Sequence, residues 1–311
     1  MSKLIVVFGA TGLQGGSVIR AILSDAKLSK TFKIRGITRD SSKPAAQHLA
    51  KQGIELAHAD LSSRSSVDAA LKDAHTVFVV TNFWETMSRD TEVSQGKTVT
   101  DAAKAAGVKH LIFSSLNNIT KTSGGRLTHV HHFDGKHDIE EYMRQSGVPS
   151  TFVLPGYYMS NFQQFMRPGE DGVYTLAVPV SADKSRFPLI DVAADYGEFI
   201  KPALVHGPHS DKIKDGRIFA AAGYYSGHEI VDIFEKTTGK KARFVSLDAE
   251  TYKSFLPPAM QMELLENHLA LEDPGYYAGA DLEPSIKLVK AEAGHVTTWA
   301  DFIKKQNEWM N

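Results

Sequence analysis

The segment VVFGATGLQGGSV, residues 6–18, constrains the fold more than any other part of the chain. It overlaps an apolar run at 3–8 that predicts a strand, and it opens an amphipathic stretch at 13–25 that predicts a helix. Gly9, Gly12 and Gly15 recur at every third residue. Glycines at this spacing allow a tight turn off a strand, close approach of the backbone to a pyrophosphate, and close packing of helix on strand. The segment predicts a dinucleotide-binding turn, the alternative being a glycine-rich turn without a ligand.

The rest of the first half repeats the alternation of short apolar runs and longer amphipathic stretches. Strands are predicted at 32–38, 54–59, 76–81, 110–115 and 150–155, and helices at 43–52, 63–72, 90–106 and 134–146. Several of these strands are apolar throughout, as expected of parallel strands covered on both faces. The pattern predicts a Rossmann-type α/β domain with a doubly wound parallel sheet over residues 1–155.

The pattern changes after Pro155. Further strands are predicted at 172–180, 216–223 and 242–248, and helices at 189–205, 228–239 and within 249–271. Asp191 is the expected cap of the helix at 189–205. These elements predict a smaller C-terminal α/β lobe, residues 156–311, that covers the first domain and interleaves with it.

Composition excludes several classes of protein. The chain has 35 lysines and arginines against 36 aspartates and glutamates and a net charge of −1, so no bulk field attracts nucleic acid or an acidic membrane. It has no cysteine, which excludes disulfides, cysteine nucleophiles and thiolate metal sites. No apolar run approaches the roughly 18 residues that span a bilayer. The N-terminus is unlike a signal or transit peptide. We expect a cytoplasmic protein, with the nucleus also open, and no direct nucleic-acid or membrane partner.

The end of the second predicted strand indicates which dinucleotide the turn binds. Its sequence is RGITRDSSK, with Arg39 and Lys43 one helical turn apart. A guanidinium can bind a 2′-phosphate through two hydrogen bonds, so this pair favours NADP. Asp40 leaves NAD open, because an acid in this region can bind two ribose hydroxyls. The alternative is that both cations are solvated surface charges.

Other cofactor contacts are expected where parallel strands end, because ligands bind beyond the carboxyl ends of such strands. Asp60 follows the third strand, Thr81, Asn82 and Phe83 end the fourth, and the segment PGYYMSNF follows the sixth. Tyr157, Tyr158 and Met159 are the expected nicotinamide wall, core packing being the alternative. The predicted cofactor set is Gly9, Ala10, Thr11, Gly12, Leu13, Gln14, Gly15, Arg39, Lys43, Asp60, Thr81, Asn82, Phe83, Lys136, Tyr157, Tyr158, Met159 and Asn161.

The segment HVHHFDGKHDIEEY, residues 129–142, contains the candidate catalytic residues. In many hydride-transfer enzymes a tyrosine lies four residues before a lysine and donates the proton; here His132 lies four residues before Lys136. Ser114 or Ser115, on the fifth strand, is a candidate to orient a substrate, and Ser115 is the one that we assign to the catalytic set. A helix N-terminus disfavours a charged imidazole, so we expect Lys136 to be retained for ribose binding and the proton-donor role to be lost or changed. The alternatives are a surface pair of Lys136 with Glu140, and a metal site at the histidines.

Together these segments resemble the NmrA-like branch of atypical short-chain dehydrogenases. The matching segments are GATGLQGGSV, ITRD, VTNFWE, FSSLNNI, HFDGK, LPGYYMSNF and the closing TTWADFIKKQ. The resemblance covers nearly the whole chain and implies a Rossmann domain, a smaller C-terminal lobe and bound NADP or NAD. It also implies contacts from the predicted cofactor set. One departure is Ser94, where sensor relatives often have a lysine.

The resemblance leaves two hypotheses. In the first, which the missing tyrosine favours, the chain is a non-catalytic NADP(H)-binding redox sensor that docks onto protein partners such as GATA-type transcription factors. In the second, it is an NADPH-dependent reductase of a small carbonyl or enone compound, with Lys136 and with His132 or a tyrosine from another segment as the acid.

Three further segments bear on these hypotheses. Residues 117–131 are polar and contain glycines, so we expect a mobile flap over the cofactor. Residues 256–273 are amphipathic and contain methionines, which favours a core helix and leaves a partner-docking face as the alternative. The aromatic segment 275–282 is expected either to close the pocket or to form a docking surface.

Overall fold

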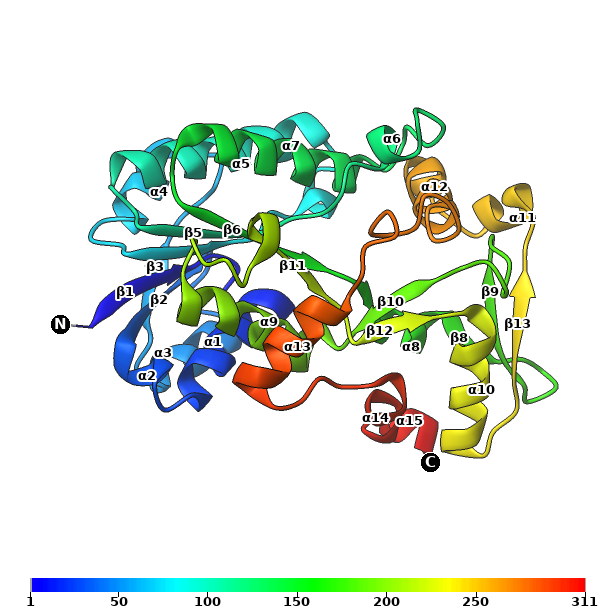
Figure 1. The fold of residues 1–311 in the computed structure, drawn as a ribbon. Coiled ribbons are helices and arrows are strands. Elements are labelled where there is room, and N and C mark those ends of the chain that lie inside the picture. The colour runs from blue at the N-terminus through cyan, green and yellow to red at the C-terminus, as the bar shows by residue number, and fades with distance from the viewer. Residues whose placement is uncertain (1, 311) are drawn as a thin grey trace.

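A seven-stranded parallel sheet forms the centre of the larger lobe in the computed structural model, which describes residues 2–310 (Figure 1). The strand order is β11-β6-β5-β4-β1-β2-β3. Apart from β11, this is the strand order expected of a doubly wound nucleotide-binding sheet. The strands are β1 (Lys3–Val7), β2 (Phe32–Thr38), β3 (Glu55–His58), β4 (Thr76–Val79), β5 (His110–Ser114), β6 (Ser150–Pro155) and β11 (Arg217–Ala220). The six strands predicted in the first half are all present.

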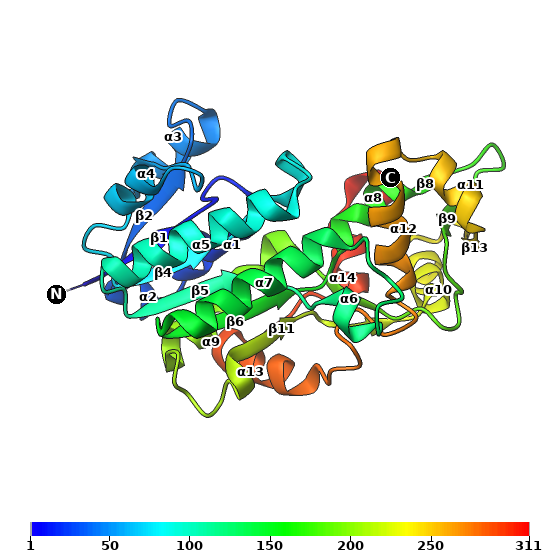
Figure 2. The same cartoon turned by 90° about the horizontal axis from the view of Figure 1, so that it is seen from above.

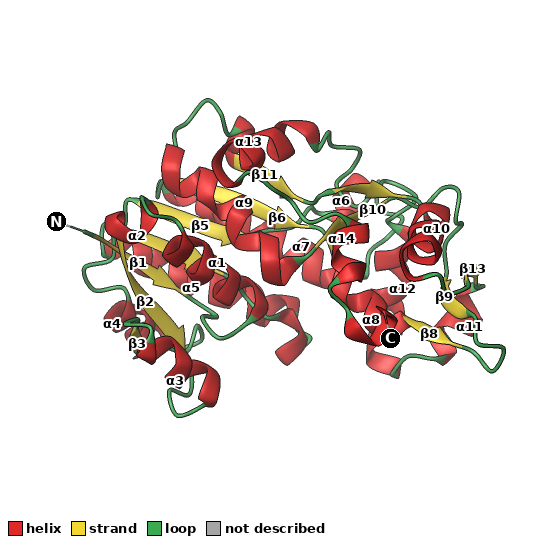
Figure 3. Ribbon diagram, turned by 90° about the horizontal axis from the view of Figure 1, so that it is seen from below, coloured by secondary structure: helices red, strands yellow, loops and turns green. Residues whose placement is uncertain are grey.

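Helices cover both faces of this sheet, which confirms the predicted fold class. One face carries α1 (Leu13–Ser24), α2 (Leu28–Thr31), α3 (Pro44–Lys51), α9 (Val192–His206) and α13 (Glu283–Ala293) (Figure 3). The other face carries α4 (Arg64–Ala70), α5 (Arg89–Ala105) and α7 (His131–Ser146), with α5 and α7 side by side (Figure 2). The crossover from one face to the other between β3 and β4 places the β1 and β4 ends next to each other, where such folds bind ligands.

Two glycines let α5 and α7 pack closely. A Cβ atom on Gly96 of α5 would lie 2.4 Å from Cγ1 of Ile139 on α7. A Cβ atom on Gly135 of α7 would lie 3.0 Å from the carboxylate of Glu92 on α5. This close approach brings Glu92 and Lys136, one from each helix, into the same buried space.

The C-terminal half contributes to the first sheet as well as to its own lobe. β11 pairs in parallel with β6, and α9 packs against α1, so the two lobes interleave. The prediction for residues 189–205 was wrong at its start, because Leu189 and Ile190 belong to β10 (Phe187–Ile190). The helix begins after Asp191, whose carboxylate accepts a hydrogen bond from the Ala194 backbone N–H at 3.1 Å. Residue Asp191 is therefore the N-cap that the sequence predicts.

The smaller lobe consists of two three-stranded sheets and a set of short helices. Its strands are β7 (Tyr157–Tyr158), β8 (Met166–Pro168), β9 (Tyr174–Val178), β10, β12 (Gly223–Tyr225) and β13 (Ala242–Ser246). Its helices are α8 (Phe162–Phe165), α10 (Gly227–Thr238), α11 (Ala249–Ser254), α12 (Gln261–Leu269), α14 (Trp299–Lys304) and α15 (Asn307–Met310). Trp299 and Trp309 are buried together with Phe162 and Phe234 in its core. Among residues 2–310, no helix combines the length and apolar character needed to cross a bilayer.

Candidate functional site

The glycine turn has the geometry that its spacing predicts. Gly9 has φ +64°, a left-handed conformation that residues with a Cβ rarely adopt. A Cβ on Gly15 would lie 2.2 Å from the Gly9 carbonyl oxygen, so only glycine lets α1 lie this close to the turn. Gly12 is the N-cap of α1 and has no side chain with which to cap it. The backbone N–H groups in the first turn of α1 therefore receive no side-chain cap and can bind a ligand. The helix dipole favours an anion at this position.

One cleft of about 980 Å³ runs from this turn across the ends of the parallel strands to α11 and α12 in the smaller lobe. The structure brings most of the predicted site residues together in its lining. These are Gly9, Thr11, Gly12, Leu13, Gln14, Gly15, Arg39, Lys43, Asp60, Thr81, Asn82, Phe83, His132, Lys136, Tyr157, Tyr158 and Asn161. Ala10 and Met159 are buried behind the lining instead, with 1% and 0% of their surface exposed. The binding role of each lining residue stays a prediction.

Arg39 and Lys43 lie at the adenosine end expected for this cleft. Arg39 is exposed and forms an ion pair with Glu85, which belongs to the TNFWE segment and follows β4. Asp40 is held in its own turn, because its carboxylate accepts hydrogen bonds from Ser42 N at 2.9 Å and Ser42 Oγ at 2.6 Å. These bonds lower the pKa of the Asp40 carboxyl. The sequence did not identify Glu85 as a contact of Arg39.

Lys136 lies in the cleft lining and is paired with a carboxylate that sequence reasoning missed. Its Nζ contacts Glu92 Oε1, and Thr81 Oγ1 donates a hydrogen bond of 2.7 Å to the same oxygen. Within the described residues 2–310, the other oxygen, Glu92 Oε2, is buried without a hydrogen-bond partner. The expected alternative, a surface pair of Lys136 with Glu140, was wrong, because Lys136 is buried and pairs across to α5.

Ser115 is not brought together with Lys136. Its hydroxyl donates a hydrogen bond of 2.6 Å to Glu140 Oε2, and the Ser115 side chain is fully buried outside the cleft lining. Glu140 Oε1 also accepts hydrogen bonds from Arg144 and Arg217. The sequence-based catalytic set therefore needs correction at Ser115, which belongs to a structural ion-pair cluster beneath β5 because a buried carboxylate on α7 engages it.

His132 faces a buried carboxylate from α12. Glu263 accepts hydrogen bonds of 3.0 Å from the backbone N–H groups of His131 and His132 and contacts Nδ1 of the His132 ring. Val130, the N-cap of α7, has no oxygen in its side chain, so Glu263 caps the helix from outside. A ring that donates from Nδ1 to Glu263 has Nε2 as its remaining acceptor. This partner was not visible in the sequence, because it is 131 residues away.

Glu266, on the next turn of α12, makes the same kind of contact with His129 at 2.6 Å between Oε1 and Nδ1. The two carboxylates thus tie the start of α7 to the smaller lobe. Across residues 2–310, no group of three or more histidine, aspartate and glutamate side chains has the arrangement of a metal site.

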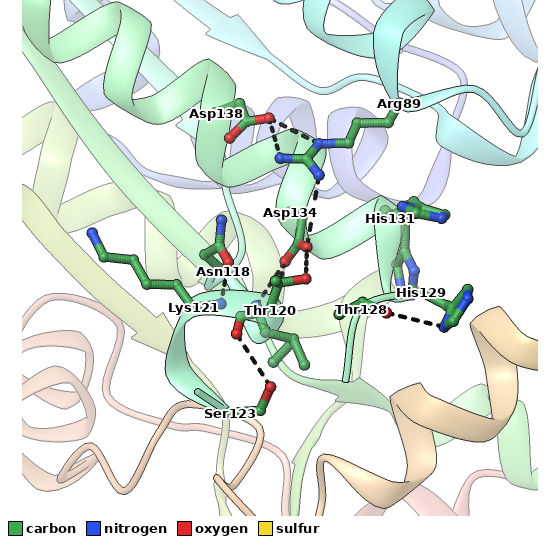
Figure 4. A network of polar contacts seen from close by, with 12 residues as sticks. Arg89, Asn118, Thr120, Lys121, Ser123, Thr128, His129, His131, Asp134 and Asp138 are labelled. Carbon is green, nitrogen blue, oxygen red and sulfur yellow. Dashed lines mark hydrogen bonds and ion pairs between the residues drawn. The ribbon is translucent and has the colours of Figure 1, made fainter. Parts of the chain in front are cut away.

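The segment 117–131 does not cover the cleft. Figure 4 shows how it is fastened to α7 instead, through Asp134, which accepts hydrogen bonds from Thr120 and from the Ile119 backbone N–H, the latter at 2.8 Å. Arg89 on α5 donates to Asp138 on α7 beside this contact. Part of the segment forms the short helix α6 (Ile119–Thr122). In the described part of the chain the cleft lining includes Leu116 but no residue from 117–131. The prediction that residues 117–131 cover the cofactor was wrong, because hydrogen bonds to the buried Asp134 hold this segment against α7.

The far end of the cleft is formed by residues that the sequence assigned to a core helix and to an aromatic segment. Tyr252 from α11, Asn267 and His268 from α12, and Tyr276 all line it, next to Tyr157. Tyr276 comes from the segment 275–282, for which closing the pocket was one of the two expected roles. The amphipathic pattern at 256–273 was the signal for α12, but it did not show that the buried face of this helix borders a cavity.

A buried polar network lies at this far end. The Tyr157 hydroxyl is 3.3 Å from His268 Nε2, and the Tyr252 hydroxyl is 3.1 Å from His268 Nδ1. Burial lowers the pKa of His268 to about 4, so the ring is neutral near pH 7. Burial also raises the pKa values of Tyr157 and Tyr252, so both hydroxyls keep their protons.

Comparisons with known proteins agree with this fold. Residues 1–303 match the sequence model of the NmrA-like family. The chain is 35% identical, over 79% of its length and 76% of the relative's, to the NmrA-like family domain-containing oxidoreductase malD of Malbranchea aurantiaca. It is 32% identical, over 81% and 78%, to the oxidoreductase ptmS of Penicillium ochrochloron.

Among solved structures, the negative transcriptional regulator Nmra in complex with NADP superposes with a TM-score of 0.80 at 22% identity, over 98% of this chain and 95% of that chain. The NADPH-dependent quinone oxidoreductase QOR2 of Escherichia coli superposes with a TM-score of 0.75 at 22% identity, over 96% and 98%. These likenesses concern the fold. The match to the family over residues 1–303, together with relatives above 30% identity, shows that the chain belongs to the NmrA-like family.

Proposed function

We propose that this chain is an NADP(H)-dependent oxidoreductase that reduces an apolar carbonyl compound. The observation that carries the proposal is the continuity of one cleft from the glycine turn to an aromatic end in the smaller lobe. A protein that only binds a dinucleotide does not need a second, largely apolar compartment beyond it. Support also comes from the relatives, which are described as oxidoreductases, and from the QOR2 and Nmra structures, which are described with NADPH and NADP.

The residues at the first end of the cleft fit a phosphorylated dinucleotide. The uncapped first turn of α1 suits the pyrophosphate, and Gly9 and Gly15 let the turn and the helix lie close enough together to present that helix end. Arg39 and Lys43 suit a 2′-phosphate. To bind it, Arg39 gives up its exposed ion pair with Glu85. NAD is the weaker candidate, because Asp40 is engaged by Ser42. When bound, NADPH supplies a hydride to the substrate.

Lys136 is the residue of this chain best suited to position the nicotinamide ribose. Its ammonium group has three N–H donors, and Glu92 needs only one of them. The buried carboxylate of Glu92 fixes the position of the ammonium group in the cleft lining. We assign Lys136 a positioning role; His132 could act as the acid only after Nε2 takes up a proton, because its Nδ1 is engaged by Glu263.

The proposal is tested by titrating NADPH and NADH into the full chain, and by following NADPH absorbance with a panel of ketones, quinones and enones. Turnover with at least one compound supports an oxidoreductase. Its loss in a Lys136→Ala protein that circular dichroism shows to be folded, while Arg64→Ala retains it, supports the role of Lys136. Arg64 is a suitable control because its pair with Asp68 is exposed and neither residue lines the cleft. Tight NADPH binding with no turnover across the panel contradicts the proposal.

A second candidate is the redox-sensing regulator that docks onto a protein partner such as a GATA-type transcription factor, in the cytoplasm or the nucleus. One observation favours it: Ser115 and His132, two of the three residues assigned to chemistry, are engaged by Glu140 and Glu263. For this candidate, NADPH and NADP binding would change the affinity for a purified partner. Equal affinity in both nucleotide states would exclude it.

A further inference from the structure

The far end of the cleft differs in character from the nucleotide end. Its lining residues include Leu256, Met260, Leu264 and Tyr276, and its polar groups belong to neutral side chains such as Asn267. Among residues 2–310, Asn267 Oδ1 is buried and has no hydrogen-bond partner. Within residues 2–310, the lining residues that α11, α12 and the segment 275–282 contribute carry no charged side chain, so this end disfavours an anionic or cationic ligand, whose lost solvation would not be compensated. The ligand that fits is neutral and largely apolar, and the aromatic side chains of Tyr157, Tyr252 and Tyr276 in the wall favour one with a planar group that packs against them.

The hydrogen bonds of His268 determine which hydroxyl can serve such a ligand. Nδ1 of His268 lies 2.9 Å from the Leu264 carbonyl oxygen, which can only accept, so Nδ1 carries the proton. Nε2 is then an acceptor, and the Tyr157 hydroxyl donates to it. The Tyr252 hydroxyl has the opposite role, because its oxygen lies 3.1 Å from the same Nδ1 and can only accept, sharing this N–H with the Leu264 carbonyl. Tyr157 therefore donates its hydroxyl proton to His268. The hydroxyl proton of Tyr252 is not used in this network and can point into the cleft.

We propose that Tyr252 is the specificity-determining hydrogen-bond donor for the substrate, and that the substrate is a planar, conjugated carbonyl compound whose oxygen accepts from the Tyr252 hydroxyl. The inference rests on the proposed oxidoreductase function and adds the substrate class and the residue that recognises it. A neutral donor in an apolar wall selects an acceptor oxygen over a hydrocarbon of the same shape, because the hydrocarbon leaves the hydroxyl unpaired. His268 is a positioning residue that holds Tyr252 in this orientation.

The test compares two flat probes in the full-length protein without nucleotide. The probes are 1,4-naphthoquinone, which has acceptor oxygens, and naphthalene, which has none. Binding of each probe is followed by isothermal titration calorimetry, which does not depend on the absorbance or the fluorescence of the probe. The chain has no cysteine with which a quinone could form a thioether. The variant is Tyr252→Phe, and the matched control is Tyr224→Phe, whose hydroxyl donates to the Ala280 carbonyl outside the cleft.

Tyr252→Phe is expected to weaken naphthoquinone binding about fivefold, the order of one neutral hydrogen bond, and to leave naphthalene binding unchanged. Tyr224→Phe is expected to bind both probes like the wild type. NADPH affinity, measured separately, stays unchanged in both variants and shows that each is folded. Equal losses for both probes in Tyr252→Phe, or no loss for the quinone, would overturn the inference, and so would a wild-type protein that binds neither probe.

The outcome for the proposed function is read separately. If NADPH fails to bind the wild type, the proposed function is wrong whatever the probes do. If NADPH binds and naphthoquinone oxidises it equally well in the wild type and in Tyr252→Phe, the function stands and the role of Tyr252 is wrong.

Discussion

The carboxylate of Glu92 on α5 lies against the ammonium group of Lys136 on α7, and the two side chains are only 1% and 10% exposed. Their helices meet at Gly96 and Gly135, where a larger residue would separate them. Lys136, which the sequence motif marks as a catalytic lysine, is therefore part of a buried ion pair. Lys136 is held at one place in the cleft lining before any ligand binds.

Lys136→Met is expected to destabilise the protein by about 3–5 kcal/mol, because it leaves the Glu92 charge buried without a partner. The double variant Lys136→Met/Glu92→Gln is expected to be more stable than Lys136→Met alone, since the unpaired charge is gone. Urea unfolding of the four members of this cycle measures the coupling. Arg64→Ala, which breaks the exposed pair with Asp68, is the control and should cost less than about 1 kcal/mol. A Lys136→Met variant as stable as Arg64→Ala would show that the pair is not buried in solution.

Glu85→Gln is expected to tighten NADPH binding by about two- to fivefold, because Glu85 competes with a 2′-phosphate for Arg39. NADH has no 2′-phosphate, so its affinity should not change. Calorimetric titration of the two nucleotides into wild type and variant gives the comparison. If the variant bound NADH and NADPH more tightly by the same factor, the effect of Glu85 would not act through the 2′-phosphate.

Gly96→Ala is expected to cost about 1–3 kcal/mol of stability, because the new Cβ would overlap Ile139. Ile139→Val removes one of the atoms in the way, so the double variant should recover part of the loss. Ser94→Ala, on the exposed side of the same helix, is the control for helix propensity and should change stability by less than about 0.5 kcal/mol. Thermal unfolding followed by circular dichroism ranks the four proteins. Equal stability of Gly96→Ala and Ser94→Ala would contradict the close packing of α5 on α7.

The fold was predictable because it depends on local patterns that recur along the chain. Each apolar run of the first half became a strand, and the chain order and right-handed crossovers then leave few topologies. β10 was missed because its four residues directly precede Asp191, so the apolar run Leu189–Ile190 was joined to the helix that Asp191 caps. The membership of β11 in the first sheet depends on long-range pairing with β6, which no local signal specifies.

The candidate site was predictable on its nucleotide side and not on its far side. Glycine spacing and strand ends fix where a dinucleotide-binding turn lies, and Gly9, Thr81 and Arg39 do line one cleft. Glu92, Glu85 and Glu263 were missed, because each meets its partner across a tertiary contact. Ser115 was misassigned since its partner Glu140 lies on a different element, and its position at a strand end does not show where the hydroxyl points.

The buried ring of His268 predicts a pH dependence of stability. Burial lowers its pKa from 6.5 to about 4 in the folded protein. Between these values the unfolded chain binds a proton that the folded protein does not, so stability falls as pH falls through this window. Between pH 7.5 and pH 5, the free energy of unfolding is expected to fall by about 2 kcal/mol more in the wild type than in the His268→Gln variant. Urea unfolding at the two pH values measures the difference. If both proteins lost the same free energy of unfolding, protonation of His268 would not destabilise the folded protein.

The most direct measurement of the central claim is a calorimetric titration of NADPH and NADH into wild type and Arg39→Ala. We predict that wild type binds NADPH at least about tenfold more tightly than NADH, and that Arg39→Ala removes this difference while it still binds both. Arg20→Ala, which removes a guanidinium of α1 that does not line this cleft, should retain it. No detectable binding of either nucleotide, or an unchanged preference in Arg39→Ala, would contradict the assignment of the cleft.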